Sequence, residues 1–255
     1  MMTERITSRK NPLLQQVKKL LSSRKTREEA GLFVADGTKL LEEAVRFFPG
    51  LQTVILTDGV QANIPEGVRE IRVPADVMES ISPMASPQGA LFICALPEKQ
   101  AFVPKPGMLL LDGLQDPGNV GTIWRTADAF GADGIFLLPG CAEPWSPKTL
   151  RSTMGASFRL PLWEGSLEGL KALLDKEGIP LYATALREDT ADIRDMDLSR
   201  AAVVIGSEGK GVSEAVLDAS ARTIKIPMTE KCESLNAASA GTVVLWQMSQ
   251  GTFPR

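Results

Sequence analysis

Short apolar runs alternate along the chain with amphipathic stretches, and some of these runs stop abruptly in loops of glycine and polar residues. The run at 202–205 ends in GSEGKG, and the run at 108–111 ends in DGLQDPGN. Short apolar runs bounded by turn residues are typical of buried parallel strands. Stretches such as 38–48 and 167–176 repeat apolar residues every three or four positions and predict helices. This alternation predicts an α/β protein with a parallel sheet.

The alternation of strand and helix occurs twice, on either side of a segment with three prolines and no periodicity, LPEKQAFVPKPGM. Prolines without periodicity are typical of a linker. We therefore expect a smaller α/β domain at 1–98, a linker at 99–107 and a second α/β domain at 108–255.

Three segments of the second domain share the order strand, polar loop and helix: 108–125, 202–211 with the residues after it, and 224–247. Because ligands of open α/β sheets gather at the carboxyl ends of the strands, we expect the three loops to form one site. Within these segments, Asp116 before Pro117 predicts one helix start, and Ser234 predicts the cap of the last helix.

The composition narrows the chemistry. The chain is 44% hydrophobic and 23% charged, and it contains no histidine. The missing histidine excludes Ser/His and Cys/His nucleophile pairs and the HExxH zinc site. Three scattered cysteines indicate free thiols in a reducing compartment. With no run of eighteen apolar residues and no signal-peptide pattern, we expect a soluble cytoplasmic protein without a metal or a membrane partner.

Charge is unevenly distributed although the net charge is only −3. The first 27 residues hold eight Lys or Arg against Glu4 alone. Such a local excess predicts contact with phosphates, and the alternative is an ordinary solvated helix face. The residues expected to contact nucleic acid are Arg9, Lys10, Lys18, Arg24, Lys25 and Arg27.

The glycine-rich segment 206–211 is not a known nucleotide motif. Its glycines do not follow the GxGxxG pattern, and it lacks the spacing and the Ser or Thr of a P-loop. A dinucleotide-dependent enzyme or an NTPase is therefore poorly supported.

Three motifs taken together resemble those of the SpoU, or TrmH-like, RNA methyltransferases of the SPOUT superfamily. The motifs are NVGTIWRTADAFGADGIFL, VVIGSEGKGVS, and IPM followed by SLNAASAG, and their order and spacing match that family. The opening ITSRKNPLLQQVKKLLSSRKTREEAGLFVADG similarly resembles the RNA-binding domain that often precedes the catalytic domain.

The resemblance implies a parallel-sheet methyltransferase domain with a C-terminal trefoil knot, behind an N-terminal RNA-binding domain like ribosomal protein L30e. It implies S-adenosylmethionine as the methyl donor, a ribose 2′-hydroxyl of RNA as the acceptor, and a homodimer. Because the family's ribosomal RNA enzymes usually carry such an N-terminal domain, we expect ribosomal RNA more than transfer RNA. A non-catalytic RNA-binding module of the same fold is the alternative.

The resemblance also assigns the cofactor site. Gly206 would bring backbone groups close to an adenine edge, while Ile226 and Leu235 would contact its faces. The alternative for each position is packing in the core. The remaining candidates for the same pocket are Met228, Ala183, Thr184, Ala185 and Leu186.

Arg125 matches the arginine that the family places at the methyl-transfer centre. It would act on the 2′-hydroxyl either as a base or as an electrostatic positioner, and a guanidinium is an awkward base. Ser234 has the second interpretation of a helix cap, and Lys210 would meet either phosphate or solvent. The polar residues that match the family's catalytic positions are Asn119, Glu208, Ser234 and Asn236.

Overall fold

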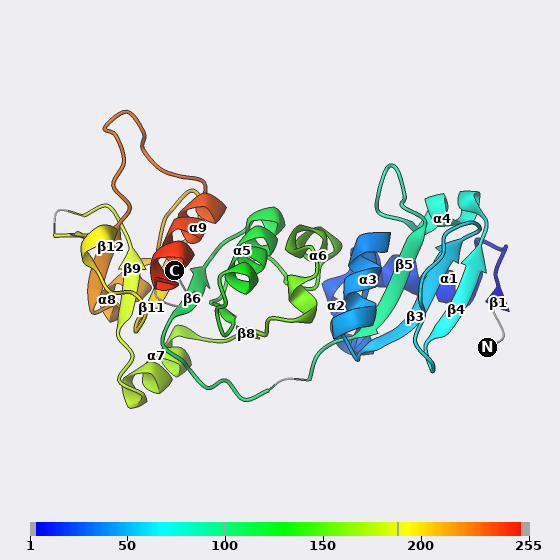
Figure 1. Ribbon diagram of the computed structural model, residues 1–255, viewed down its shortest axis with the longest axis horizontal. Coiled ribbons are helices and arrows are strands. Elements are labelled where there is room, and N and C mark those ends of the chain that lie inside the picture. The colour runs from blue at the N-terminus through cyan, green and yellow to red at the C-terminus, as the bar shows by residue number, and fades with distance from the viewer. Residues whose placement is uncertain (1–3, 99, 188, 251–255) are drawn as a thin grey trace. The chain divides into compact units, whose positions relative to one another are not determined.

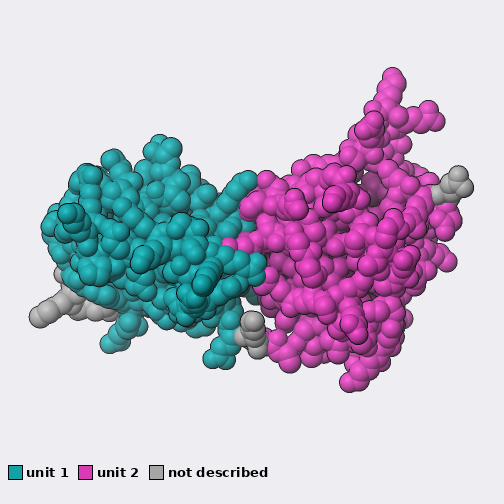
Figure 2. All heavy atoms as spheres, turned by 180° about the vertical axis from the view of Figure 1, so that it is seen from behind, with its two compact units in different colours: residues 1–98, 145–159 teal, residues 99–144, 160–255 magenta. Residues whose placement is uncertain are grey.

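The computed structural model describes residues 4–98, 100–187 and 189–250. Residue 99 of the predicted linker, residues 1–3 and residues 251–255 lie outside these ranges. The chain forms two compact units, which Figure 2 distinguishes by colour. The first comprises Met1–Glu98 with Trp145–Arg159, and the second comprises Lys99–Pro144 with Leu160–Arg255.

The first unit is a five-stranded mixed sheet with helices on both faces (Figure 1). Its strand order is β1-β4-β3-β5-β2, in which β5 runs antiparallel to β2 and β3 and the other pairs are parallel. Its elements before the linker are β1 Glu4–Arg5, α1 Pro12–Ser22, α2 Arg24–Ala30, β2 Leu32–Asp36, α3 Thr38–Phe47, β3 Leu51–Thr57, β4 Arg69–Val73, α4 Ala75–Ile81 and β5 Ala90–Ala95.

Alternation along the strands divides the core of this unit between the two faces of the sheet. In β2, Phe33 and Ala35 pack in one cluster with α3, while Val34 packs in the other with α1 and α4. Successive strand residues point to opposite faces, so a strand buried on both sides is apolar throughout. This is why the segment lacks a polar alternation in the sequence.

A side-chain cap and a proline set the start of α1. The Asn11 side chain accepts a hydrogen bond from the Leu13 amide, and Pro12 occupies the first helical position. The sequence pattern did not predict α2 as a separate helix. Ser23, in an extended conformation, ends α1 and caps α2 by accepting from the Thr26 amide. Gly31 then ends α2 at a φ of 64°, which glycine adopts without strain.

Residues 145–159 follow the predicted linker in sequence but pack in the first unit. They form α6 Pro147–Thr153 and the 3₁₀ turn η1 Ala156–Phe158. Leu150 is 0% exposed and Phe158 is 5% exposed, and both join the cluster around Phe33 and Phe92. The expected functional domains at 1–98 and 108–255 stay a prediction. The core of the first unit, however, includes side chains from residues beyond 108.

The second unit is built on a seven-stranded sheet whose neighbouring strands are all parallel, as predicted (Figure 1). The strand order is β10-β12-β9-β11-β6-β7-β8. Its elements are β6 Met108–Asp112, α5 Pro117–Ala129, β7 Ile135–Leu137, β8 Leu162–Glu164, α7 Leu167–Lys176, β9 Leu181–Thr184, β10 Ala191–Asp192, the 3₁₀ turn η2 Ile193–Asp195, β11 Ala202–Gly206, α8 Glu214–Ala219, β12 Arg222–Lys225 and α9 Ala237–Met248.

Helices α5 and α9 pack against each other in this unit. A Cβ at Gly241 of α9 would lie 3.0 Å from Ile123 of α5, so a small residue is needed where the helices meet. The predicted cap of the last helix is wrong: α9 begins after Asn236, whose side chain accepts from the Ala238 and Ser239 amides. Ser234 lies before the cap in an irregular segment.

No helix in the described part of the chain is long and apolar enough to cross a membrane. The expected cytoplasmic location stays a prediction.

The packing of residues 145–159 makes a prediction about the first unit. Leu150→Ala should lower the free energy of unfolding of that unit by about 2–5 kcal/mol, because it leaves a cavity in a fully packed core. Hydrogen exchange should accelerate in β2 and β5. Leu174→Ala, an equally buried change in the core of the second unit, is the matched control and should leave β2 and β5 protected. Equal protection of β2 and β5 in all three proteins would contradict this assignment of the core.

Candidate functional site

The carboxyl ends of four adjacent strands lie at one edge of the parallel sheet. In the order β12-β9-β11-β6, these strands end at Lys225, Thr184, Gly206 and Asp112. Gly206 pairs directly with Asp112, so β11 and β6 end level with each other. The loops that follow these strands therefore leave from the same edge, as expected from the sequence.

The loop after β11 folds back on its own strand. Ser207 and Gly211 exchange two backbone hydrogen bonds, each of 2.9 Å. A Cβ at Gly206 would lie 2.1 Å from both the Gly211 carbonyl carbon and the Val212 nitrogen. The chain itself therefore requires glycine at 206, because its own backbone fills the space that a side chain would occupy. The expected contact of Gly206 with a cofactor stays a prediction.

Three of the expected catalytic residues are brought together by the fold. The Asn119 amide nitrogen donates to a Glu208 carboxylate oxygen at 2.7 Å, and the Asn236 amide donates to the Asn119 oxygen at 3.2 Å. These side chains come from α5, the loop after β11 and the cap of α9. The cluster therefore links the three segments that carry the sequence motifs.

Asp112 is a residue of this edge that the sequence analysis missed. Its side chain is buried, and Oδ2 accepts a hydrogen bond of 2.7 Å from the Ser213 amide. Ser213 precedes α8 and has no capping bond of its own. Asp112 thus ties the end of the glycine-rich loop to β6. The sequence did offer one signal, a carboxylate at the end of an apolar run. A carboxylate buried in such a position needs hydrogen-bond donors.

Arg125 does not lie within this cluster. It is exposed on α5, and it forms no hydrogen bond or ion pair with any other described residue. At about 100° per residue, it lies about 240° around the helix from Asn119. The guanidinium is therefore available to a ligand at the surface of α5, while Asn119 faces Glu208.

The expected cofactor residues divide by exposure. Leu186 is 65% exposed and Leu235 is 38% exposed, whereas Ile226 and Met228 are half-buried. The other positions at the end of β9 are used by the sheet. Ala183 is buried, the Thr184 hydroxyl donates to the Val204 carbonyl at 2.9 Å, and the Ala185 amide donates to the Ile224 carbonyl at 3.0 Å. Thr184 and Ala185 are also half-buried, and the expected contact of all these positions with a cofactor stays a prediction.

The expected RNA-binding residues of the first unit differ in accessibility. Arg9 pairs with Asp76, Arg24 with Glu28 and Lys25 with Glu29, all at exposed positions. Arg27 is 4% exposed and donates to the Leu20 carbonyl, so it braces two helices and is not at the surface. Lys10 is exposed and Lys18 is half-buried.

A cysteine near the site is no nucleophile. The Cys141 thiol donates to the Leu111 carbonyl at 3.3 Å, next to the end of β6. Burial raises the pKa of Cys141 to about 11, so the thiol is protonated at neutral pH.

Within the described residues there is also no group of Cys, Asp and Glu that could hold a metal ion.

The close approach at Gly206 can be tested by substitution. Gly206→Ala should lower the free energy of unfolding by about 3 kcal/mol, the upper end of the usual cost of overpacking, because the added Cβ meets backbone that cannot move independently. Gly209→Ala is the control, since its Cβ would meet nothing within 4 Å, and it should change stability by less than about 0.5 kcal/mol. Urea unfolding of the three proteins measures the difference, and equal stabilities would show that residues 211 and 212 do not cross Gly206.

Comparison with known proteins gives matches along nearly the whole chain. Residues 106–246 match the model of the SpoU rRNA Methylase family, and residues 11–91 match the MRM3-like substrate binding domain. The chain is 32% identical to the 23S rRNA (guanosine(2553)-2′-O)-methyltransferase RlmP of Bacillus subtilis, over 96% of this chain and 99% of that protein. It is 30% identical to the 23S rRNA (uridine(2479)-2′-O)-methyltransferase of Streptomyces viridochromogenes, over 95% and 91% of the two chains.

The solved structures give the same result. The crystal structure of an AdoMet-bound rRNA methyltransferase from Sinorhizobium meliloti has a TM-score of 0.87 and 27% identity, and covers 99% of both chains. The resemblance expected from the three motifs is confirmed, as is the expected pairing of an α/β methyltransferase domain with an N-terminal α/β substrate-binding domain. This chain belongs to the SpoU rRNA methylase family.

Proposed function

We propose that this protein transfers a methyl group from S-adenosylmethionine to a ribose 2′-hydroxyl of ribosomal RNA, at the carboxyl edge of its parallel sheet. The observation that carries the proposal is the cluster of Asn119, Glu208 and Asn236, which joins the three family motifs in space. The named activities of relatives that match over the full chain support the same reaction and the same class of substrate.

The residues at the sheet edge fit an S-adenosylmethionine site. Leu235 and Leu186 expose apolar side chains there, and Ile226 is half-buried beside the end of β12. An adenine ring is flat and apolar on its faces and polar at its edges, which suits leucine and isoleucine beside backbone amides and carbonyls. We assign Ile226, Met228, Leu235 and the backbone of Gly206 to this pocket.

When bound, S-adenosylmethionine would supply its sulfonium methyl group to the ribose 2′-oxygen and leave as the neutral thioether, while the hydroxyl proton would pass to solvent. The chain has no histidine to take that proton. A guanidinium is a donor with no acceptor, so we assign Arg125 the role of stabilising negative charge on the 2′-oxygen and holding the neighbouring phosphate. Its exposure on α5 leaves it accessible to RNA.

The polar cluster orients the reacting groups. Glu208 is the exposed carboxylate of the loop after β11, and its bond to Asn119 fixes that loop relative to α5. Asn236 fixes the start of α9 to the same point. Much of the acceleration of a transfer reaction comes from holding the two reactants in line, so loosening this cluster should slow turnover. We assign Ser234, which lies two residues before Asn236 in the segment that leads into α9, to contact with the substrate.

The first unit selects the RNA in this proposal. It matches a substrate-binding domain. Lys10 is exposed and Lys18 is half-buried, and no Asp or Glu lies within two positions of either lysine in the sequence. Folded RNA is recognised through phosphates, shape and unpaired bases. The L30e-like fold of this unit and the trefoil knot of the second unit stay predictions.

The role of Arg125 is tested by its removal. Arg125→Ala should lower kcat for methylation of ribosomal RNA by at least about 100-fold, the cost of losing one oxyanion donor, while the Kd for S-adenosylmethionine stays the same. Labelled cofactor and ribosomal RNA from cells lacking the enzyme provide the assay, and calorimetry provides the Kd. Arg200→Ala, which removes an exposed arginine at the opposite edge of the sheet, is the control. Undiminished transfer by Arg125→Ala would refute the assigned role.

We also propose that the protein is a homodimer through the surface of α9. Val243 is 36% exposed and Trp246 is 56% exposed on that helix. The Trp246 ring packs edge-on against Phe130 after α5, with centroids 5.6 Å apart, and its remaining surface is uncovered within the described residues. A large exposed aromatic beside apolar neighbours is typical of an interface.

Trp246→Glu should convert the protein from dimer to monomer, because it places a charge in the proposed apolar interface. Light scattering coupled to size exclusion gives the mass. Phe47→Glu, at an aromatic of the first unit that is 38% exposed, is the control and should remain dimeric. A monomeric natural sequence, or a dimeric Trp246→Glu variant, would contradict the proposed interface.

A further inference from the structure

The first unit contains a pocket of about 290 Å³ that the proposed reaction does not use. It opens beside α4, where β3 ends and β5 begins. The residues that line it are Thr57, Val60, Ala75, Met78, Glu79, Pro87, Gln88 and Gly89.

One wall of this pocket is closely packed. Gly89 has a φ of 78°, and a Cβ there would lie 2.4 Å from the Thr57 hydroxyl and 2.8 Å from a Val60 methyl. The Thr57 amide donates to the Gly89 carbonyl at 2.9 Å. The turn before β5 is therefore held directly against the end of β3, so this side of the pocket is preformed.

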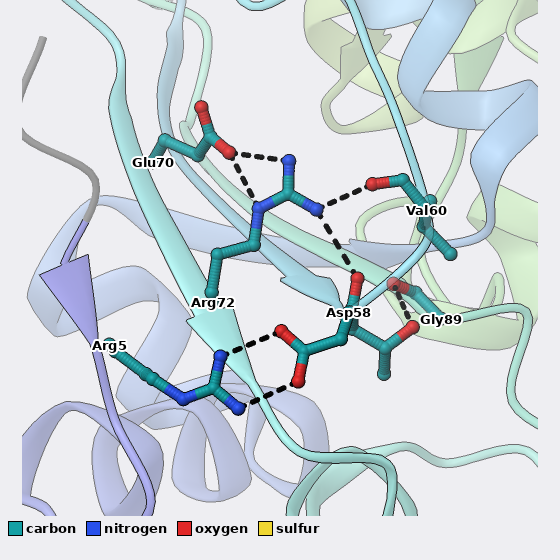
Figure 3. A network of polar contacts seen from close by, with 7 residues as sticks. Arg5, Asp58, Val60, Glu70, Arg72 and Gly89 are labelled. Carbon is teal, nitrogen blue, oxygen red and sulfur yellow. Dashed lines mark hydrogen bonds and ion pairs between the residues drawn. The ribbon is translucent and has the colours of Figure 1, made fainter.

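A network of ion pairs braces the same wall from outside (Figure 3). Arg72 donates to the carbonyls of Val60 at 2.5 Å and Thr57 at 3.3 Å, and also pairs with Glu70. Arg5 forms two hydrogen bonds with Asp58, of 2.8 and 2.7 Å. The hydrogen bond from Arg5 lowers the pKa of Asp58, so the pair is ionised at neutral pH. A site whose supporting groups are already ordered loses less entropy on binding.

Two polar side chains of the pocket stand apart from this network. Neighbouring carboxylates are paired with arginines, as in Asp58 with Arg5, Glu70 with Arg72 and Asp76 with Arg9. Glu79 and Gln88 have no hydrogen bond or ion pair among the described residues. The pocket thus presents an unused carboxylate and an unused amide beside the half-buried side chains of Val60 and Pro87.

This chemistry selects the ligand. A phosphate is disfavoured, because no lysine or arginine lines the pocket and Glu79 carries a negative charge. A flat base can lie on Val60 and Pro87, which are half-buried, while its edge meets the polar groups. A carboxylate only accepts hydrogen bonds, and guanine offers it two adjacent donors, N1–H and the N2 amino group. Uracil offers one donor between two carbonyl oxygens that a carboxylate would repel.

We propose that this pocket binds an unpaired guanine of the RNA substrate, with Glu79 accepting from N1 and N2 and Gln88 donating to O6. The inference rests on the proposed function for its RNA. It assigns to the first unit a base-specific contact in addition to any contact with phosphates. Sequence-specific recognition of RNA uses such splayed bases, read at their Watson–Crick edges.

The test uses the full chain and short single-stranded oligouridylates with one central guanosine, adenosine or cytidine, followed by fluorescence anisotropy. The guanosine oligomer should bind about 5- to 100-fold more tightly than plain oligouridylate, the usual range for one well-read base. Glu79→Gln and Ala75→Phe should abolish this preference, the first by removing the acceptor and the second by filling the pocket from an exposed position. Glu42→Gln, an exposed carboxylate on α3, is the matched control and should retain it.

Two outcomes overturn the inference: equal affinity of the natural sequence for all the oligomers, or a guanosine preference that survives in both Glu79→Gln and Ala75→Phe. Methylation of ribosomal RNA is measured on the same preparations. Transfer without the preference would refute the pocket and leave the proposed reaction standing. A guanosine preference without methyl transfer would support the pocket and refute the proposed reaction.

Discussion

The parallel pairing of β11 with β6 is the constraint on which the rest of the second unit depends. It sets Gly206 opposite Asp112, so the two loops that carry sequence motifs begin level with each other at the carboxyl edge of the sheet. The chain then turns back over Gly206 so closely that no side chain fits there, and the Asp112 carboxylate holds the end of the turn. These two contacts fix the loop that carries Glu208, whose carboxylate accepts a hydrogen bond from Asn119.

The polar groups of this protein divide into those that the fold consumes and those that it leaves available. Thr184, Arg27 and Asp112 complete backbone hydrogen bonds and are buried or half-buried. An unpaired buried donor or acceptor is costly, so the fold satisfies these groups through the backbone. The expected contact of Thr184 with a cofactor stays a prediction. Arg125, on α5, keeps its hydrogen-bonding capacity unused within the described chain. Whether a polar side chain supports the fold or is available to a ligand therefore depends more on its hydrogen-bond partners than on its residue type.

The first unit extends the same principle to its core. Leu150 and Phe158 lie far along the chain, yet they complete the cluster around Phe33 and Phe92. A domain of about a hundred residues buries a limited fraction of its surface, and the added segment increases that fraction. Polar bracing is also local here: Arg72 and Glu70 hold the end of β3 through half-buried charges, which solvent screens less than exposed ones.

The sequence by itself determined the alternation of strands and helices, the parallel sheet, the helix start at Asp116, and the family, because these depend on local periodicity, caps and contiguous motifs. The cap at Asn236 in place of Ser234, the separate helix α2 and the burial of Arg27 were decided by tertiary structure. Either Ser234 or Asn236 can cap a helix, and in the folded chain Asn236 both caps α9 and donates to Asn119 of α5. Likewise, the position of 145–159 and the role of Asp112 depend on partners distant in the chain, which no local pattern records.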